Sequence, residues 1–174
     1  MPTTSLWRAA IDELAGRIEQ AEGVGKVFSG EESVDTLAEI LELAAEPITE
    51  DEFLHETQKI NCWQVMRTSV QAARAPDLPR QQRWRVHSIR IRGWLGMGEG
   101  TWERFQEIVD NVLDKLEGID NIAFTRETGS QDFMDVDPPS ASIGFDNFSV
   151  YGCHYCEMTM TLRERRLVPA VHSL

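Results

Sequence analysis

The sequence predicts an α+β domain, in which a largely antiparallel sheet is packed by an N-terminal and a central amphipathic helix and carries an acidic helical insertion. Two segments place apolar residues at helical spacing, and three longer segments alternate apolar and polar residues as strands do. Helices and strands do not alternate regularly along the chain, which favours α+β over a parallel α/β fold. A length of 174 residues fits one domain, and no linker divides residues 1–174.

The first helix is expected over residues 5–23, SLWRAAIDELAGRIEQAEG. Ser5 or Thr4 is a suitable N-cap, and Gly23 is a suitable end. The apolar residues recur on one helical face: Leu6, Trp7, Ala10, Ile11, Leu14 and Ile18. VGKVF follows as a short strand candidate.

An acidic insertion is predicted over residues 31–56. Ser33 can cap a helix there that stops before Pro47, and its apolar residues are Leu37, Ile40, Leu41 and Ala44. This helix has the character of a surface insertion.

Two strands and a second helix are expected next. KINCWQVMRTSV (59–70) and RWRVHSIRIRGW (83–94) are rich in strand-forming residues, and a loop with two prolines separates them. In the second strand Ile89 and Ile91 share one face, whereas Arg90 and Arg92 point the other way. TWERFQEIVDNVLDKLEG (101–118) has strong helical periodicity, with Thr101 as the expected cap.

The C-terminal part is expected to hold a loop and a long strand. Residues 126–147 are polar and contain Gly129, the pair Pro138 and Pro139, and Gly144, which predicts a flexible loop or a mobile hairpin. FSVYGCHYCEMTMTLRERR (148–166) then closes the domain as a strand.

Charge is segregated along the chain, whose formal net charge is −12. Residues 31–56 contain ten acids and no Lys or Arg, and residues 67–92 contain seven arginines against one acid, Asp77. One interpretation is a pair of solvated faces; the other is two complementary surfaces that meet between neighbouring copies. The candidate interface residues are Glu39, Glu42, Glu46, Glu50, Asp51, Glu52, Arg67, Arg74, Arg80, Arg83, Arg85, Arg90 and Arg92.

Composition limits the other classes of function. A strongly acidic chain is a poor general binder of nucleic acid or anionic membranes, because both need positive surface. No apolar run approaches a membrane span, and the N-terminus lacks the basic and apolar regions of a signal peptide. Three cysteines, an odd number, favour a reducing compartment. The expected place of synthesis and assembly is therefore a cytoplasm.

The glycine-rich turn GWLGMGEG (93–100) raises the alternative of a nucleotide site. Its glycines have GxGxG spacing instead of GxGxxG, and the Lys of a Walker A loop is missing. Glu99 and Glu103 also place negative charge where a phosphate would sit. A small nucleotide-binding protein using Gly96 to Gly100 stays the alternative hypothesis, beside a simple flexible connection.

Metal and catalytic patterns are weak. Cys153 and Cys156 fall on opposite faces of a strand, so they cannot share one zinc ion. Asp132, Asp135 and Asp137 lack the rest of a calcium loop, and no GxSxG elbow is present. His87 is expected to be a buried structural histidine with its polar atoms satisfied. Trp84, between Arg83 and Arg85, has two interpretations, stacking on a nucleotide base and strand packing. The sequence predicts no catalytic residue, no cofactor and no metal site.

The order of the elements resembles a known family. The N-terminal helix leading into GVGKVF, the strand VHSIRIRGWL, the helix ERFQEIVDNVLDKLEG and the last strand VYGCHYCEMTMTLRER are together similar to the tail terminator proteins of long-tailed bacteriophages and phage-like particles. The resemblance covers most of the chain apart from the acidic insertion. It rests on element order and apolar pattern, so it transfers no catalytic residue.

The resemblance implies a structural virion protein. Family members are α+β domains that form a ring, usually of six copies, on the tail tube; they end its polymerisation and join it to the head-side connector. The implied partners are other copies of the chain, tail tube protein and neck proteins, with DNA passing through the lumen without specific binding. A head completion protein of the same virion is an open alternative.

Overall fold

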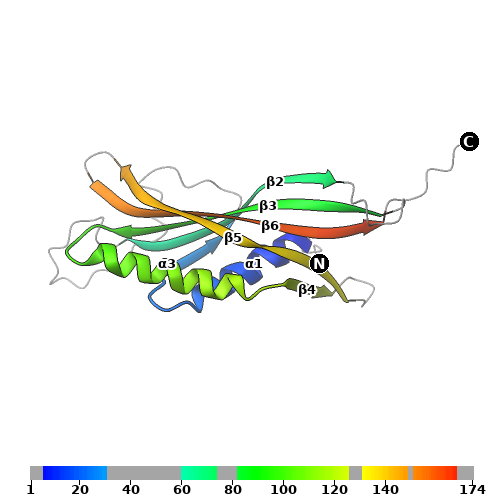
Figure 1. The fold of residues 1–174 in the computed structure, drawn as a ribbon, viewed down its shortest axis with the longest axis horizontal. Helices are drawn as coiled ribbons and strands as arrows, with labels where there is room; N and C mark the ends of the chain where they lie inside the picture. Colours follow the sequence, from blue (N-terminus) through cyan, green and yellow to red (C-terminus); the bar gives the residue numbers. More distant parts are fainter. Residues whose placement is uncertain (1–5, 31–59, 74–81, 126–130, 149–150, 168–174) are drawn as a thin grey trace, which may run out of the picture.

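The computed structural model describes residues 6–30, 60–73, 82–125, 131–148 and 151–167. In chain order, the elements are α1 (Leu6–Glu19), β1 (Lys26–Ser29), β2 (Asn61–Ala73), β3 (Gln82–Gly96), α3 (Thr101–Glu117), β4 (Asn121–Thr125), β5 (Gln131–Phe148) and β6 (Tyr151–Leu167). These elements make an α+β fold with two helices and one six-stranded sheet (Figure 1). The predicted acidic helix lies outside the described residues.

The sheet is mixed, with strand order β1-β2-β3-β6-β5-β4. The β1–β2 pair is parallel, and the other four neighbouring pairs are antiparallel. The longest ladder joins β3 to β6, from Gln82 opposite Leu167 to Gly96 opposite Cys153. This central pair places the two halves of the chain side by side and carries the polar groups considered below.

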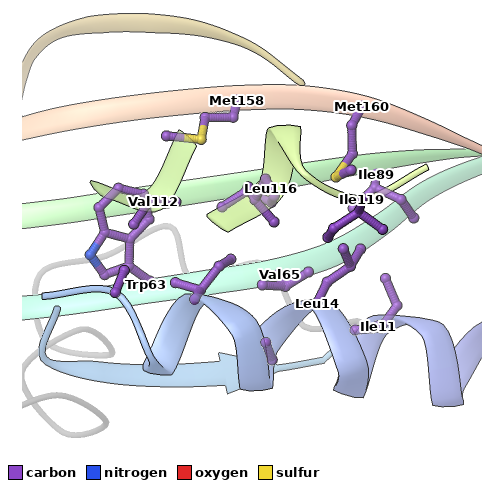
Figure 2. Packing of buried hydrophobic residues seen from close by; sticks show 14 of the residues in the cluster. Ile11, Leu14, Trp63, Val65, Ile89, Val112, Leu116, Ile119, Met158 and Met160 are labelled. Carbon is purple, nitrogen blue, oxygen red and sulfur yellow. The ribbon is translucent and has the colours of Figure 1, made fainter. Parts of the chain in front are cut away.

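Both helices lie on the same side of the sheet (Figure 1). Ile11 and Leu14 of α1 and Val112 and Leu116 of α3 project into one apolar layer with the strand residues (Figure 2). The strands contribute Trp63, Val65, Ile89, Ile91, Cys156, Met158, Met160 and Leu162 to the same cluster. Each fully buried large side chain contributes about 1.5 to 3 kcal/mol, so this layer is the main source of stability.

The connection from α1 to β1 is held by one side chain of β2. Asn61 accepts a hydrogen bond from the Gly25 N–H at 3.0 Å and donates one to the Gly23 carbonyl at 2.9 Å. Gly23 has φ of +82°, a conformation that other residues rarely adopt. The predicted stop at Gly23 therefore corresponds to a turn that β2 fixes in place.

Residues 126–147 were predicted to be a flexible loop or a mobile hairpin, and the loop is wrong where the structure describes them. Residues 131–148 form β5, which pairs with β4 on one side and with β6 on the other. The register shifts between Asp137 and Ser140, at the two prolines. Proline lacks an N–H and is tolerated at a bulge or on an edge strand. The turn-like composition thus marked a bulge in a strand.

The start of α3 also differs from the prediction. Gly100 is the N-cap, with φ of +70°, and Thr101 is the first helical residue, not the cap. No helix among the described residues is long and apolar enough to cross a membrane.

Candidate functional site

The side of the sheet opposite the helices carries most of the described charged strand residues, and we call it the polar face. Successive residues of a strand point to opposite faces of the sheet. Ile89 and Ile91 belong to the core on the helix side, so Arg90 and Arg92 lie on the polar face. The residues of the polar face used below are Trp84, Arg90, Arg92 and Trp94 of β3, Asp135 and Asp137 of β5, and Tyr155, Glu157, Arg163 and Arg165 of β6.

Glu157 is the centre of the polar face. The Tyr155 hydroxyl donates a hydrogen bond to Glu157 Oε2 at 2.7 Å. Arg92 Nε lies 3.4 Å from the same oxygen, and Arg90 Nε lies 3.7 Å from Oε1. The pKa of Glu157 is lowered, first by the Tyr155 hydrogen bond and then by the two arginine charges, although burial opposes the shift. Glu157 is therefore a carboxylate at neutral pH, held by three side chains.

A second ion pair lies further along β6. Arg163 Nη2 donates to Asp137 Oδ2 at 2.6 Å, across the β5–β6 ladder. Both side chains are more than a third exposed, so the pair adds little to stability. The pair orients the two charges. It also gives Asp137, one of the three aspartates considered as calcium ligands, an arginine partner.

A shallow pocket of about 190 Å³ lies near the end of the polar face where β4 is located. Its lining residues are Trp84, Phe133, Asp135 and Arg165. The Arg165 guanidinium carbon is 5.3 Å from the centre of the Trp84 ring, and Phe133 is 48% exposed. An exposed aromatic beside an arginine is typical of protein contact surfaces.

The candidate arginines do not form one patch. Arg67 is on the helix side, where its guanidinium carbon lies 3.8 Å from the centre of the Trp7 ring of α1. Arg85 lies 3.9 Å from Glu164, and Arg83 is exposed at the start of β3. Arg74, Arg80 and the six candidate acids, Glu39, Glu42, Glu46, Glu50, Asp51 and Glu52, lie outside the described residues. The charge pairing between copies stays a prediction.

A buried polar pair lies on the helix side of the sheet. His87 Nε2 is 3.5 Å from Glu164 Oε2, and both residues are 1% exposed. The predicted burial of His87 is confirmed. The prediction that its ring nitrogens are hydrogen-bonded is wrong, because neither nitrogen makes a hydrogen bond to the described residues. Glu164 was not singled out from the sequence. Its only signal is its place after Cys156, Met158, Met160 and Leu162 on the buried face of β6.

The glycine-rich turn is fastened by Thr101 and His154. Thr101 Oγ1 donates to the Gly98 carbonyl at 2.7 Å and accepts from the Gly98 N–H at 2.8 Å. His154 Nε2 lies 2.8 Å from the same oxygen. Because the one hydroxyl proton goes to Gly98, His154 must carry its proton on Nε2. The Gly98 amide, which a phosphate would need, is therefore already bonded within the turn.

His154 is packed between aromatic rings. Its ring centre lies 5.7 Å from that of Phe105 and 5.2 Å from that of Trp102. Burial lowers the pKa of His154, although Glu103 opposes the shift. The histidine is thus a neutral structural link between β6 and the start of α3.

The cysteines are divided between the two faces of the sheet, as the alternation predicts. Cys153 packs with Cys62 and Trp94 on one side, and Cys156 belongs to the main core on the other. Burial raises the pKa of both Cys62 and Cys156 to about 12, so these are unreactive thiols at neutral pH.

Sequence comparisons assign this chain to no known family. The chain matches no protein-family model, and no curated protein is significantly similar to it.

Proposed function

We propose that this protein is a structural virion component that forms a ring, with six copies, on the tail tube of a long-tailed phage or phage-like particle. The ring ends polymerisation of the tube and joins it to the head-side connector. Each copy is a domain of residues 1–174 with a largely antiparallel sheet, packed by the N-terminal and central helices and carrying the acidic insertion.

The construction of the polar face carries the proposal. Its charged side chains bind one another, as Glu157 does with Arg90 and Arg92, and lie on a broad strand surface. A surface of fixed charges suits contact with a macromolecule, because electrostatic complementarity sets register and orientation. The exposed Phe133 beside Arg165 adds an anchor of the kind found in protein interfaces.

The resemblance rests on the order of elements in this chain. An N-terminal helix, a short strand, two long strands and a helix come first, and β4, β5 and the last long strand, β6, follow. A ring needs two different surfaces on each copy, since each contact joins unlike patches. The acidic segment 31–56 and the arginine-rich segment 67–92 are opposite in charge along the sequence, and Arg90 and Arg92 of the second segment lie on the polar face. A net charge of −12 also suits a channel through which DNA slides, because phosphate contacts need positive charge.

Electron microscopy tests the proposal directly. The purified protein is mixed with tail tube protein from the same source and viewed in negative stain, while native mass spectrometry gives the number of copies. Rings at the tube ends, with tubes of limited length, are expected. Tubes of unrestricted length with bare ends would contradict the terminator role. Rings that bind the head-side connector but leave tube length unlimited would indicate a head completion protein.

A further inference from the structure

Two stretches of strand on opposite borders of the sheet have no described strand on their outer side. β1 pairs with β2 only from Cys62 to Val65, so we call Thr68–Ala73 the β2 edge. β4 pairs with β5 only from Gln131 to Asp135, so we call Ser140–Phe148 the β5 edge. Each edge is paired on its inner side, with β3 and β6 respectively.

Both edges have little of the usual protection against strand pairing. Natural edge strands commonly carry lysine, proline or an inward charge that prevents another strand from adding. The β2 edge reads TSVQAA and contains no charged residue or proline. The β5 edge reads SASIGFDNF, in which Asp146 is the one charged residue and no proline occurs. Val70 is 48% exposed and Ile143 is 41% exposed. An exposed edge with so little charge is suited to addition of a strand.

The directions of the two edges are compatible with each other. From β2 to β3, from β3 to β6 and from β6 to β5 the direction reverses each time, so β5 runs opposite to β2. When identical copies are placed side by side in the order of the sheet, the β5 edge of one meets the β2 edge of the next in antiparallel orientation. This is a contact between unlike surfaces, as a ring requires.

The shapes of the two borders are also compatible. Ile143 of β5 lies opposite Cys156 of β6, and Cys156 lies opposite Gly93 of β3. Gly93 lies opposite Trp63 of β2, which is itself paired with β1. Ala72 of β2 lies opposite Arg85 of β3, and Arg85 lies opposite Glu164 of β6. Glu164 lies opposite Met134 of β5, which is itself paired with β4. Among the described strands, the β5 edge is thus unpaired on its outer side at the end where β1 lies, and the β2 edge at the end where β4 lies. A shift along the strands brings the edges together and leaves room for both short strands.

We propose that copies of this chain assemble by antiparallel pairing of the β5 edge of one copy with the β2 edge of the next, which makes the sheet continuous across the contact. The proposal rests on the proposed ring and names the surfaces that build it. The shift between copies is compatible with closure, because strands that tilt against the axis close a sheet when their register is staggered.

Cross-linking in trans tests the pairing. One preparation carries Val70→Cys and another carries Ile143→Cys, and a short bismaleimide is added to each alone and to the mixture. Cys62, Cys153 and Cys156 are buried and make little background. A covalent dimer is expected in the mixture, with at least tenfold less in either preparation alone. Equal yield from Ile143→Cys alone would show a contact of like edges and overturn the proposal.

Lysine substitution provides a second measurement. Val70→Lys and Ile143→Lys place a charge on an exposed position of each edge, and each is expected to weaken association at least tenfold while circular dichroism stays unchanged. Gln106→Lys on the exposed side of α3 makes the same charge change away from both edges and is the control. Normal association of both edge variants would also overturn the pairing.

The experiments distinguish failure of the edge pairing from failure of the terminator role. A wild-type ring on the tube ends without the mixed cross-link refutes the edge pairing and leaves the terminator role intact. A wild-type protein that stays monomeric beside tail tubes refutes the terminator role, and the edge pairing with it.

Discussion

The indole of Trp63 in β2 packs directly over Gly93 in β3, its partner across the ladder. A Cβ atom built on Gly93 would lie 2.7 Å from the ring carbons of Trp63. Trp63 is fully buried and cannot move outward, since Phe105 of α3 lies against it with ring centres 6.4 Å apart. The glycine therefore makes room for the largest side chain of the core.

Gly93→Ala is expected to lower the free energy of unfolding by about 1 to 3 kcal/mol, because overpacking a filled core forces side chains and backbone apart. Urea denaturation followed by tryptophan fluorescence measures the change. Gly16→Ala is the matched control, since a Cβ there meets nothing within 4 Å and Gly16 lies inside α1. That control should raise stability by about 0.5 to 1 kcal/mol. Equal effects of the two substitutions would contradict the packing argument.

Tyr155→Phe is expected to raise the pKa of Glu157 toward its ordinary value, because the hydroxyl hydrogen bond is the largest cause of the lowering. The lowered pKa contributes stability above the unfolded pKa of about 4.3, and this stability is lost as pH falls through the folded pKa. The variant should lose part of that acid-dependent stability. Carbon NMR of the Glu157 carboxyl measures the pKa directly.

Glu157→Gln serves as the reference for this measurement, because it removes the titration while Tyr155 keeps its ring contact with Trp94. The stability of this variant between pH 5 and pH 3 should change less than that of the wild type. An unchanged Glu157 pKa in Tyr155→Phe would mean that the arginines hold the carboxylate without the hydroxyl.

His154 gives the protein a second pH response, in the same direction as that of Glu157 but at higher pH. Its folded pKa is lowered by burial, so the unfolded state binds more protons between that value and about 6.5. The free energy of unfolding should therefore fall as pH is lowered below about 6.5 and stop falling below the folded pKa. His154→Phe keeps an aromatic ring between Trp102 and Phe105 and should flatten this part of the profile. Urea midpoints between pH 7.5 and pH 5 provide the test.

Thr101→Val removes the hydrogen bonds between Thr101 and Gly98 while the titrating side chain of His154 stays in place. The variant keeps the histidine but loses the bonds to both backbone groups of Gly98. A cost of about 0.5 to 1.5 kcal/mol is expected at pH 7.5, the usual net contribution of a hydrogen bond, since the bonds to Gly98 are exposed to solvent. A cost near zero would mean that the turn is held without Thr101.

The predicted role of the acidic segment is tested by neutralisation. Changing Glu39, Glu42, Glu46 and Glu50 to Gln removes four charges that are proposed to face arginines of a neighbouring copy. At about 0.5 kcal/mol for each exposed pair, association should weaken about thirtyfold at low salt. Sedimentation velocity at several salt concentrations measures the effect.

The matched control removes the same charge from the exposed side of α3, by changing Glu107, Asp110, Asp114 and Glu117 to Gln. Association should then stay within a factor of three of the wild type. Equal weakening in both variants would show that net charge matters and that the acidic segment makes no specific contact.

The elements that could be predicted from sequence are those whose own residues determine them. α1, α3, β3 and β6 each show a continuous periodicity in which buried and exposed positions are set by local spacing. β2 was predicted from its strand-forming residues, since Cys62 to Met66 are all buried and show no alternation. β5 was missed because its prolines lie at a bulge, and β4 is a strand only through pairing with β5. The CHYC alternation was predicted correctly, because opposite faces follow from spacing alone.

The polar contacts could not be predicted in the same way. Arg90 and Arg92 were placed on the correct face, but their partner Glu157 comes from the register of β3 on β6, which no local pattern determines. The pairing of His87 with Glu164 arises from the same ladder. Two residues that are far apart in sequence become neighbours only when the register is known.

His87 and Glu164 provide the last prediction, because removing one member of a buried pair differs in effect from removing both. His87→Leu leaves the buried Glu164 without its histidine contact and should cost about 1 to 3 kcal/mol, since Arg85 still lies 3.9 Å from Glu164 Oε2. Glu164→Met leaves the buried His87 without its carboxyl contact and should cost a similar amount. The double variant should recover most of the loss and lie within about 1.5 kcal/mol of the wild type. Urea denaturation of the four proteins gives the coupling energy, and simple additivity of the two losses would show that the residues act independently.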